Sequence, residues 1–437
     1  MNSFCIVTLN ALRTTILMLA ALAGANSPAL FAQTGYGQSG SSQPNPDRPA
    51  AKPGESPESI RQVISKPMIA AEKLIAEKKF QEALDQIAEA EKVDGKTPFE
   101  RYVLDRMLAT AALGVGNEAL AVKSLESVFA SGRVPAADAL NFMAVLARIH
   151  YRLKDYQQAA IWAARAVKEP GVRIETRLLL GQSAYLTKDF ATAKTEISLV
   201  VEAAEKAGKP ASKDQLQLLA SIAHLTNDTV GYIAVLEKLV VNYPKKSYWA
   251  DLIYRVESKA GFADRLALDT YRLKLMTGVM TKKPDFLEMA ALTLQSGYSA
   301  DAQKVIDAGI AAGALAKDTT VDSEKKLMES IRKELADEKA RAAKGDLSTV
   351  KSSVALLNNG FDLVVKGDAN KGLEMMEAGL QAVDLRRPEE ARLRYGIALV
   401  LAGQKAKASE IFKTVQGADG TAGLARLWDL YTRQAGA

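Results

Sequence analysis

The chain has 437 residues, of which 48% are hydrophobic and 25% charged, proportions that are ordinary for a folded protein and exclude a wholly disordered one. Aromatic residues are sparse at 6% while alanine is abundant, which favours tightly packed helices over a β-sandwich. The formal net charge is +6, and residues of both signs are interspersed along the chain. This pattern argues against a nucleic-acid-binding protein, in which Lys and Arg would cluster, and leaves open weak attraction to an anionic surface.

Residues 1–32 are predicted to be a secretory signal peptide. One basic residue, Arg13, is followed by the apolar run ILMLAALAG and then by small residues. The run is about ten residues long, against the ~20 that a membrane-spanning helix needs, so an uncleaved anchor is the less favoured alternative. Cleavage is expected after Ala32 or, alternatively, after Ala25. It would lower the net charge from +6 to +5, because Arg13 is the one charged residue removed.

The single cysteine, Cys5, lies within this signal. A mature chain without cysteine can form no disulfide and offers no thiol nucleophile or thiolate metal ligand. No later stretch is long and apolar enough to span a membrane. We therefore expect a soluble periplasmic protein that is stabilised by its core alone.

Residues 33–61 are predicted to be a disordered linker. In QTGYGQSGSSQPNPDRPAAKPGESPE, at residues 33–58, half of the residues are Gly, Pro or Ser. Such a segment buries too little apolar surface to offset the entropy of ordering it. Its GYGQSG stretch is no phosphate-binding loop, because no strand precedes it and no helix follows it.

From residue 62 the pattern becomes pairs of helices joined by short turns, and the pairs repeat. A small residue recurs early in the second helix of the four clearest pairs, in steps of 38, 38 and 34 residues, at Ala83, Ala121, Ala159 and Ala193. Another recurs in the first helix, twelve residues earlier each time, at Ala71, Ala109, Ala147 and Gly181. Small residues at these places let two antiparallel helices approach closely.

These positions carry a resemblance to the tetratricopeptide repeat (TPR). The matching residues are Leu180, Gly181, Phe190 and Ala193 in one repeat, and Ala147, Tyr156, Ala159, Ala166 and Pro170 in another. The resemblance covers most of residues 63–315 and returns at 352–416. It implies an all-α fold, an α-solenoid of TPR-like helical hairpins, with an N-terminal array at residues 62–315.

Residues 316–345 are predicted to be a charged spacer helix that interrupts the array. Its narrow apolar stripe consists of Val321, Leu327, Met328, Ile331 and Leu335. A short unpaired arm of coiled-coil type is the alternative. Residues 346–437 restore the repeat, with small residues Gly372 and Ala408 spaced 36 apart. Near the end, LARLWDLYTRQ is expected to be a capping helix that covers the last apolar face.

No catalytic constellation stands out. The two histidines, His150 and His224, fall in different repeats, and zincin, phosphate-loop and nucleophile-elbow motifs are absent. His150 is expected to be a packing residue. We predict that the protein is no enzyme and takes no metal or cofactor. An active site assembled from distant repeats is a remote alternative.

A concave surface lined by the first helix of each repeat is the predicted binding site. Four residues after the small positions come Tyr151, Tyr185 and His224, and one residue after them come Arg148, Gln182 and Ser221. Amphipathic rings with polar neighbours suit an extended peptide or a helix of a protein partner. The alternative is that Tyr151 and Tyr185 only pack against the next repeat.

Residues 240–315 also resemble a group of exported bacterial repeat proteins that are often encoded beside TonB–ExbB–ExbD energy-transduction systems. The matching features are Tyr243-Pro244-Lys245-Lys246, Tyr248-Trp249, Leu287 with Ala290, and Gly309 with Gly313, and Trp428 matches more loosely. Leu266 and the polar segment GFADRLALD depart from the repeat rule.

This resemblance implies a periplasmic adaptor for transport machinery, with periplasmic or membrane-associated protein partners, no nucleic acid and no small-molecule cofactor. The expected function is accordingly a non-catalytic scaffold for protein–protein interaction. The alternative, of another class, is a binding protein or assembly factor for cell-envelope material such as glycan.

Overall fold

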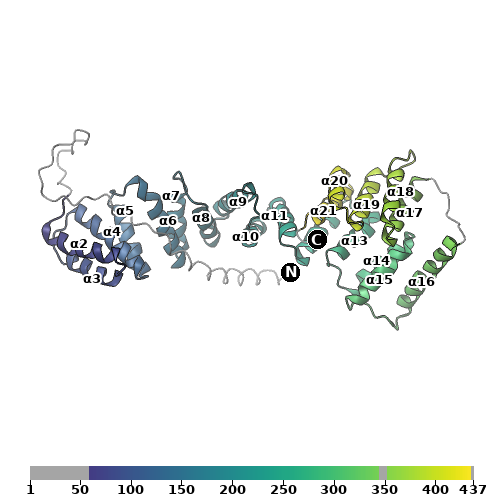
Figure 1. Cartoon of the computed structure of the whole chain (residues 1–437), viewed down its shortest axis with the longest axis horizontal. Coiled ribbons are helices and arrows are strands. Elements are labelled where there is room, and N and C mark those ends of the chain that lie inside the picture. Colours follow the sequence, from purple (N-terminus) through teal and green to yellow (C-terminus); the bar gives the residue numbers. More distant parts are fainter. Residues whose placement is uncertain (1–58, 344–351, 435–437) are drawn as a thin grey trace. The chain divides into compact units, whose positions relative to one another are not determined.

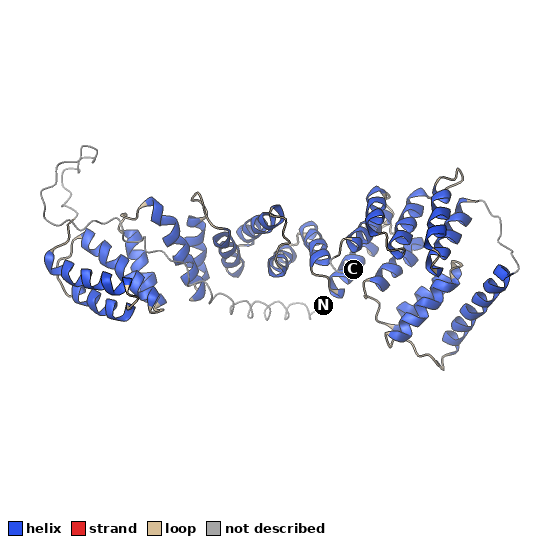
Figure 2. Ribbon diagram, viewed as in Figure 1, coloured by secondary structure: helices blue, strands red, loops and turns tan. Residues whose placement is uncertain are grey.

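The computed structural model (Figure 1) describes residues 59–343 and 352–434. These residues form twenty α-helices and one 3₁₀ helix, and no strand occurs among them (Figure 2). The all-α fold of paired helices is confirmed. The predicted signal peptide, both cleavage positions and nearly all of the linker lie outside the described residues. Within the described ranges, no helix combines the length and the hydropathy that crossing a bilayer requires.

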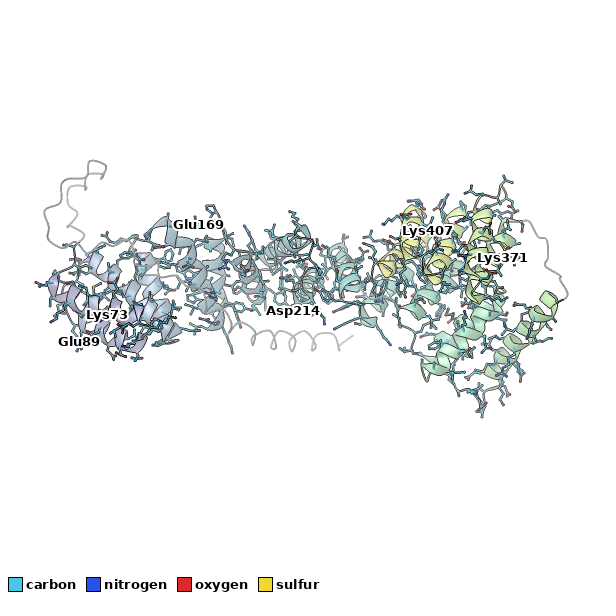
Figure 3. All side chains as sticks on the ribbon, viewed as in Figure 1. Lys73, Glu89, Glu169, Asp214, Lys371 and Lys407 are labelled. Carbon is cyan, nitrogen blue, oxygen red and sulfur yellow. The ribbon has the colours of Figure 1, made fainter. Side chains whose placement is uncertain are left out.

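The chain separates into two compact units, Met1–Val172 and Arg173–Ala437, which are described one at a time. In the first unit three hairpins follow one another: α2 (Gln62–Ala76) with α3 (Phe80–Glu91), α4 (Pro98–Gly114) with α5 (Glu118–Ala130), and α6 (Ala136–Arg152) with α7 (Tyr156–Ala166). Charged side chains such as Lys73 on α2 and Glu89 on α3 lie on exposed faces (Figure 3). The first described helix of the unit begins at Gln62, and the array bounds stay a prediction.

The alanines predicted at the helix crossings are buried in all three hairpins of this unit. None is more than 2% exposed, and the six are Ala71, Ala83, Ala109, Ala121, Ala147 and Ala159. Larger side chains, including Ile64, Met68 and Ile87, fill the core on either side of them. Small residues thus bring the helices together while large ones supply the buried apolar surface.

A Lys-Asp-aromatic sequence forms the turn in two of the hairpins. Lys154 and Lys188 adopt left-handed backbone conformations, with φ of 65° and 67°. The carboxylates of Asp155 and Asp189 then accept a hydrogen bond, 3.1 Å long in both cases, from the third N–H of the following helix. The lysine ends one helix and the aspartate caps the next, so this repeated sequence encodes the turn.

The second unit contains the remaining helices. They are α8 (Ile174–Leu186), α9 (Phe190–Lys206), α10 (Lys213–Leu225), α11 (Thr229–Asn242), α12 (Lys246–Glu257), η3 (Asp264–Leu266), α13 (Ala267–Met276), α14 (Lys283–Gln295), α15 (Ser299–Ala311), α16 (Asp322–Ala343), α17 (Ser353–Lys366), α18 (Ala369–Leu380), α19 (Pro388–Leu401), α20 (Lys405–Thr414) and α21 (Thr421–Thr432). Five pairs form hairpins: α8–α9, α10–α11, α14–α15, α17–α18 and α19–α20. Two of these hairpins, α17–α18 and α19–α20, follow residue 352, and the predicted domain boundaries there stay a prediction.

The crossing of α17 and α18 depends on glycine. A Cβ atom added to Gly372 would lie 2.5 Å from the carbonyl oxygen of Gly360, and one added to Gly360 would lie 2.6 Å from that of Gly372. The two backbones therefore meet without a side chain between them. This is the closest form of the small-residue crossing that the repeat pattern predicts.

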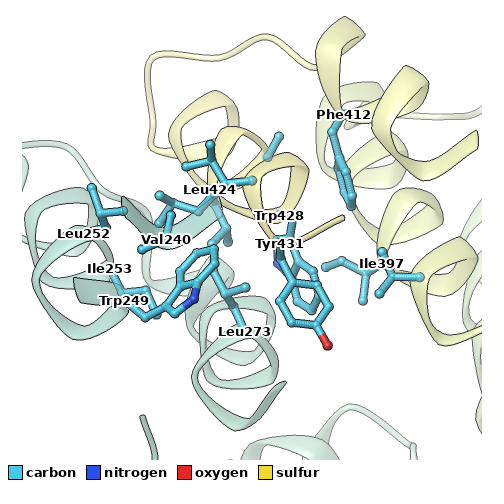
Figure 4. Packing of buried hydrophobic residues seen from close by; sticks show 14 of the residues in the cluster. Val240, Trp249, Leu252, Ile253, Leu273, Ile397, Phe412, Leu424, Trp428 and Tyr431 are labelled. Atoms are coloured by element: carbon cyan, nitrogen blue, oxygen red, sulfur yellow. The ribbon is translucent and has the colours of Figure 1, made fainter. Parts of the chain in front are cut away.

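Helices α12 and α13 do not form a hairpin like the other pairs, because a third helix, α21, also packs against α12. The C-terminal helix α21 packs against α11 and α12 as well as against α19 and α20. The ring of Trp249 on α12 lies 6.4 Å from that of Tyr431 on α21, and Leu273 of α13 belongs to the same cluster (Figure 4). Leu266, which stands where a small residue was expected, is fully buried in η3.

Several contacts hold α21 in this position. The guanidinium of Arg426 forms two hydrogen bonds, of 2.6 and 2.5 Å, with the carboxylate of Glu237 on α11, 189 positions earlier. The N–H of Ala263 donates to the carbonyl of Asp419 at 2.9 Å. Trp428 is fully buried. The helix covers the apolar face of α20, as expected of a cap, and its other side joins the C-terminus to the middle of the unit.

Helix α16 packs against α14 and α15 instead of standing free as an arm. Met328 and Ile331 are buried, as the apolar stripe predicts, and Lys283 on α14 pairs with Glu324 at 3.0 Å. Val321 was expected in the apolar stripe of this helix, but it precedes the helix and is 45% exposed.

Candidate partner-binding surface

Two of the predicted binding residues, Arg148 and Tyr151, lie on α6 in the first unit. Arg148 is exposed and Tyr151 is half-buried. The Tyr151 ring lies 5.3 Å from that of Tyr156 at the start of α7, and burial together with this neighbour raises the pKa of the Tyr151 hydroxyl. Tyr151 thus packs within its own hairpin and presents only part of its ring to solvent.

The remaining predicted residues lie on α8 and α10 in the second unit. Gln182 and Tyr185 are half-buried on α8. The Tyr185 hydroxyl lies 2.9 Å from that of Ser221 on α10, and its ring is 6.0 Å from Phe190. The structure brings these positions of neighbouring first helices together, as the spacing predicts. Part of Tyr185 serves packing, which was the alternative interpretation.

His224 is exposed at the end of α10 and continues the same surface. Its ring lies 6.2 Å from that of Tyr232 on α11. The Tyr232 hydroxyl donates to Asp251 on α12 at 2.8 Å, and the guanidinium of Arg255 lies 4.7 Å from the ring centroid. Partial burial, followed by this hydrogen bond, raises the pKa of Tyr232 to about 12. The phenol is therefore a neutral donor over the physiological pH range.

Sequence reasoning missed Tyr254 on α12, which is 68% exposed. Counted from the first residue of each helix, Tyr254 is the ninth residue of α12, just as Ser221 and Gln182 are the ninth residues of α10 and α8. The repeat pattern did not point to Tyr254 because the residue before it is the large Ile253, whereas α8 and α10 have the small residues Gly181 and Ala220 at that position. Counting from the helix start at Lys246 would have shown that Tyr254 corresponds to Gln182 and Ser221.

We call the surface formed by Tyr185, Ser221, His224, Tyr232 and Tyr254 the aromatic strip. It runs over α8, α10, α11 and α12 and combines exposed ring faces with hydroxyl and imidazole groups. Such groups can make apolar contact and hydrogen bonds to the same ligand. The binding role of the predicted residues Arg148, Tyr151, Gln182, Tyr185 and His224 stays a prediction.

His150 is a packing residue. It is 6% exposed, and its Nε2 atom lies 3.2 Å from the Glu126 carboxylate while Nδ1 lies 3.7 Å from that of Asp155. His224 lies in the other unit. Over residues 59–343 and 352–434, no three His, Cys, Asp or Glu side chains gather closely enough to suggest a metal site.

A buried ionic network joins helices of the second unit. Asp269 on α13 bonds Arg272 at 2.9 Å and Arg394 on α19 at 3.2 Å. Arg272 also reaches Asp301 at 3.0 Å, and Arg394 reaches Glu390 at 2.8 Å. Each of these carboxylates is paired with a guanidinium, which does not deprotonate, so the network cannot pass protons at neutral pH. We interpret it as fixing α13, α15 and α19 relative to one another.

Comparisons with known proteins give no family. No family model matches the chain, and no curated protein does. Among solved structures, a tetratricopeptide repeat protein from Parabacteroides merdae ATCC 43184 is 10% identical, with a TM-score of 0.30, over 78% of this chain and 100% of its own. The TPR domain of P58(IPK) is 14% identical, with a TM-score of 0.21, over 86% and 99%. With scores this low, the description of the fold rests on the helix pairing of the chain itself.

Proposed function

We propose that the protein is an exported, non-catalytic scaffold that binds a protein partner in the periplasm. The observation that carries this proposal is the aromatic strip, above all the 68% exposure of Tyr254 and the exposure of His224. An exposed tyrosine at a repeating first-helix position has no packing role that explains it. Tyrosine offers a large contact area at low cost in side-chain entropy, which is why it is enriched in protein interfaces.

An extended peptide or one face of a helix suits the strip best. Ser221 and Tyr254 are the ninth residues of α10 and α12, and Tyr185 and His224 are the twelfth residues of α8 and α10. Part of the surface therefore repeats from helix to helix, as a peptide backbone does. The Tyr185–Ser221 hydrogen bond and the Tyr232–Asp251 hydrogen bond hold parts of the strip in place before binding. A preorganised surface loses less entropy when a ligand binds.

We further propose that the partner belongs to a TonB-type transport system of the outer membrane. The support is the resemblance over residues 240–315. Tyr248 and Trp249, which carry much of it, are buried in the core of the second unit. They therefore support a shared architecture, and the partner must be sought with the exposed residues.

A second candidate is binding of cell-envelope glycan. The exposed rings of His224 and Tyr254 favour it, because aromatic faces can pack against the apolar faces of sugar rings. It differs from the first candidate in the chemistry of the ligand, which capture experiments identify directly.

The test is crosslinking in cells followed by mass spectrometry, on the natural chain and on His224→Ala/Tyr254→Ala. We expect a defined protein to be captured and its yield to fall at least severalfold in the double variant. Leu199→Ala, a change at an exposed apolar position on α9, serves as the control. Thermal unfolding should be nearly unchanged in both variants. Capture of glycan fragments alone, or equal protein capture by the double variant, would contradict the proposal.

A further inference from the structure

Four exposed lysines stand in two pairs at the starts of two helices in the second unit. Lys245 and Lys246 begin α12, and Lys282 and Lys283 begin α14. Neither residues 243–250 nor residues 275–284 contain an Asp or a Glu. These two stretches are therefore local concentrations of positive charge, which end at Asp251 and Asp285.

The fold brings the two pairs to the same neighbourhood. The side chain of Lys246 lies against Gly278, where an added Cβ would be 3.0 Å from its Cε atom and 3.5 Å from its Nζ atom. Gly278 belongs to the turn that leads into α14, and Met280, buried in that turn, anchors it. The Lys246 ammonium therefore lies over the segment that reaches Lys282 four residues later. We call the four residues the lysine edge.

Internal contacts account for only part of this charge. Lys283 pairs with Glu324, and the Lys245 ammonium lies 5.6 Å from the ring centroid of Tyr248. No ion pair within residues 59–343 and 352–434 involves Lys245, Lys246 or Lys282. Cations at the start of a helix also oppose the helix dipole. Asp285 in the first turn of α14 and Glu324 offset part of the charge of Lys282 and Lys283, while the start of α12 has no acidic residue in its first turn.

We propose that the lysine edge docks an acidic segment of a protein partner, whose carboxylates pair with Lys245, Lys246 and Lys282. The inference rests on the proposed function, since the segment belongs to the bound protein, and it adds a second surface to the aromatic strip. A protein segment is favoured over a lipid surface because Lys283 is already paired with Glu324, which leaves three lysines, fewer than the roughly four to eight basic residues that recognition of anionic lipids usually takes. Three lysines without a carboxylate partner match a short acidic peptide.

The test uses the full chain and a fluorescein-labelled hexaglutamate peptide, with binding followed by fluorescence anisotropy. We expect binding that weakens as salt rises, because exposed charges are screened. The triple variant Lys245→Gln/Lys246→Gln/Lys282→Gln should lose about tenfold in affinity. Lys325→Gln/Lys326→Gln/Lys333→Gln is the control, since it removes the same charge from exposed positions on α16 and should bind as the natural chain does.

Three results would overturn the inference: no binding of hexaglutamate, an equal loss in the control variant, or binding only to phosphatidylglycerol vesicles with the same lysine dependence. The outcome is separable from that of the proposed function. If hexaglutamate does not bind but His224→Ala/Tyr254→Ala still captures less protein than the natural chain, only the lysine edge is refuted and the scaffold role stands. Hexaglutamate binding without any captured protein would contradict the scaffold role instead.

Discussion

The two units of the chain use the same hairpin in different ways. In residues 59–172 each hairpin packs on the next one along the chain, and the core is built from neighbours in sequence. In residues 173–434 the C-terminal helix α21 returns to α11 and α12, and the Arg426–Glu237 pair joins positions 189 residues apart. The first unit is thus an open array, whereas the second is closed by long-range contacts.

This difference bears on how each unit should unfold. In an open array, stability is approximately a sum of repeat and nearest-neighbour contributions, so damage stays local. In the closed unit, α21 packs against helices from the middle and from the end of the sequence. A destabilising substitution in α21 should therefore also destabilise those helices. The buried network of Asp269, Arg272 and Arg394 strengthens this coupling, because it joins α13 to α19.

The largest expected effect comes from Trp428→Ala in α21. Trp428 is fully buried, and its removal should lower the free energy of unfolding of the second unit by about 3–5 kcal/mol. Hydrogen exchange measured by mass spectrometry should speed up in α11 and α12 as well as in α20. The matched change Trp162→Ala in α7 should affect only the neighbouring hairpins of the first unit. Unchanged exchange in α12 would show that the second unit is not coupled through α21.

A smaller effect is expected from Asp269→Asn. The change removes a buried charge between two guanidinium groups, yet Asp301 and Glu390 still balance them. The free energy of unfolding should therefore fall by about 1–3 kcal/mol, less than for a buried pair left without any partner. The control is Asp214→Asn, at the exposed position on α10 labelled in Figure 3, which should cost at most a few tenths of a kcal/mol in urea unfolding, because Asp214 is exposed and lies in the first turn of the helix. Equal stability of the two variants would contradict a structural role for the network.

The smallest effect concerns acid unfolding of the first unit. The carboxylate of Glu100 accepts hydrogen bonds from Arg61 at 2.9 Å and from the N–H of Thr97 at 2.8 Å. These contacts, led by the Arg61 side chain, lower the pKa of Glu100 to about 2. Because the folded pKa is below the unfolded one, this stabilisation is present above about pH 4.5 and is lost as the pH falls towards 2.

We expect this linkage to contribute about 1–2 kcal/mol, a figure reduced because Arg61 is partly exposed to solvent. In Glu100→Gln, urea unfolding of the first unit should show that much less stability at pH 7 than the natural chain, and the difference should shrink towards pH 2. A difference that stays constant between pH 7 and pH 2 would refute the assignment.

The sequence by itself determined the hairpin and its repetition. Ala83, Ala121 and Ala159 are buried at helix crossings as their spacing predicts, and the Lys-Asp-aromatic turns cap the helices they separate. These features depend on residues within one or two repeats, so they can be inferred from spacing. Spacing also placed Tyr185 and Ser221 on one expected surface, and their hydroxyls lie 2.9 Å apart, while their binding role stays a prediction.

Only the tertiary structure decided how the array ends. An amphipathic helix at a C-terminus must cover an apolar face, but the sequence does not specify which of several similar faces it covers. The place of α21 between α20 and α12 follows from Trp249, Trp428 and Tyr431 packing together and from the Arg426–Glu237 pair. The Trp249–Tyr431 contact and the Arg426–Glu237 pair join residues 182 and 189 positions apart, where no periodicity connects them. The exposed position of Tyr254 could not be inferred from spacing for a related reason. Helix α12 packs against α21, so it does not need a small residue at a hairpin crossing, and the repeat pattern is lost there.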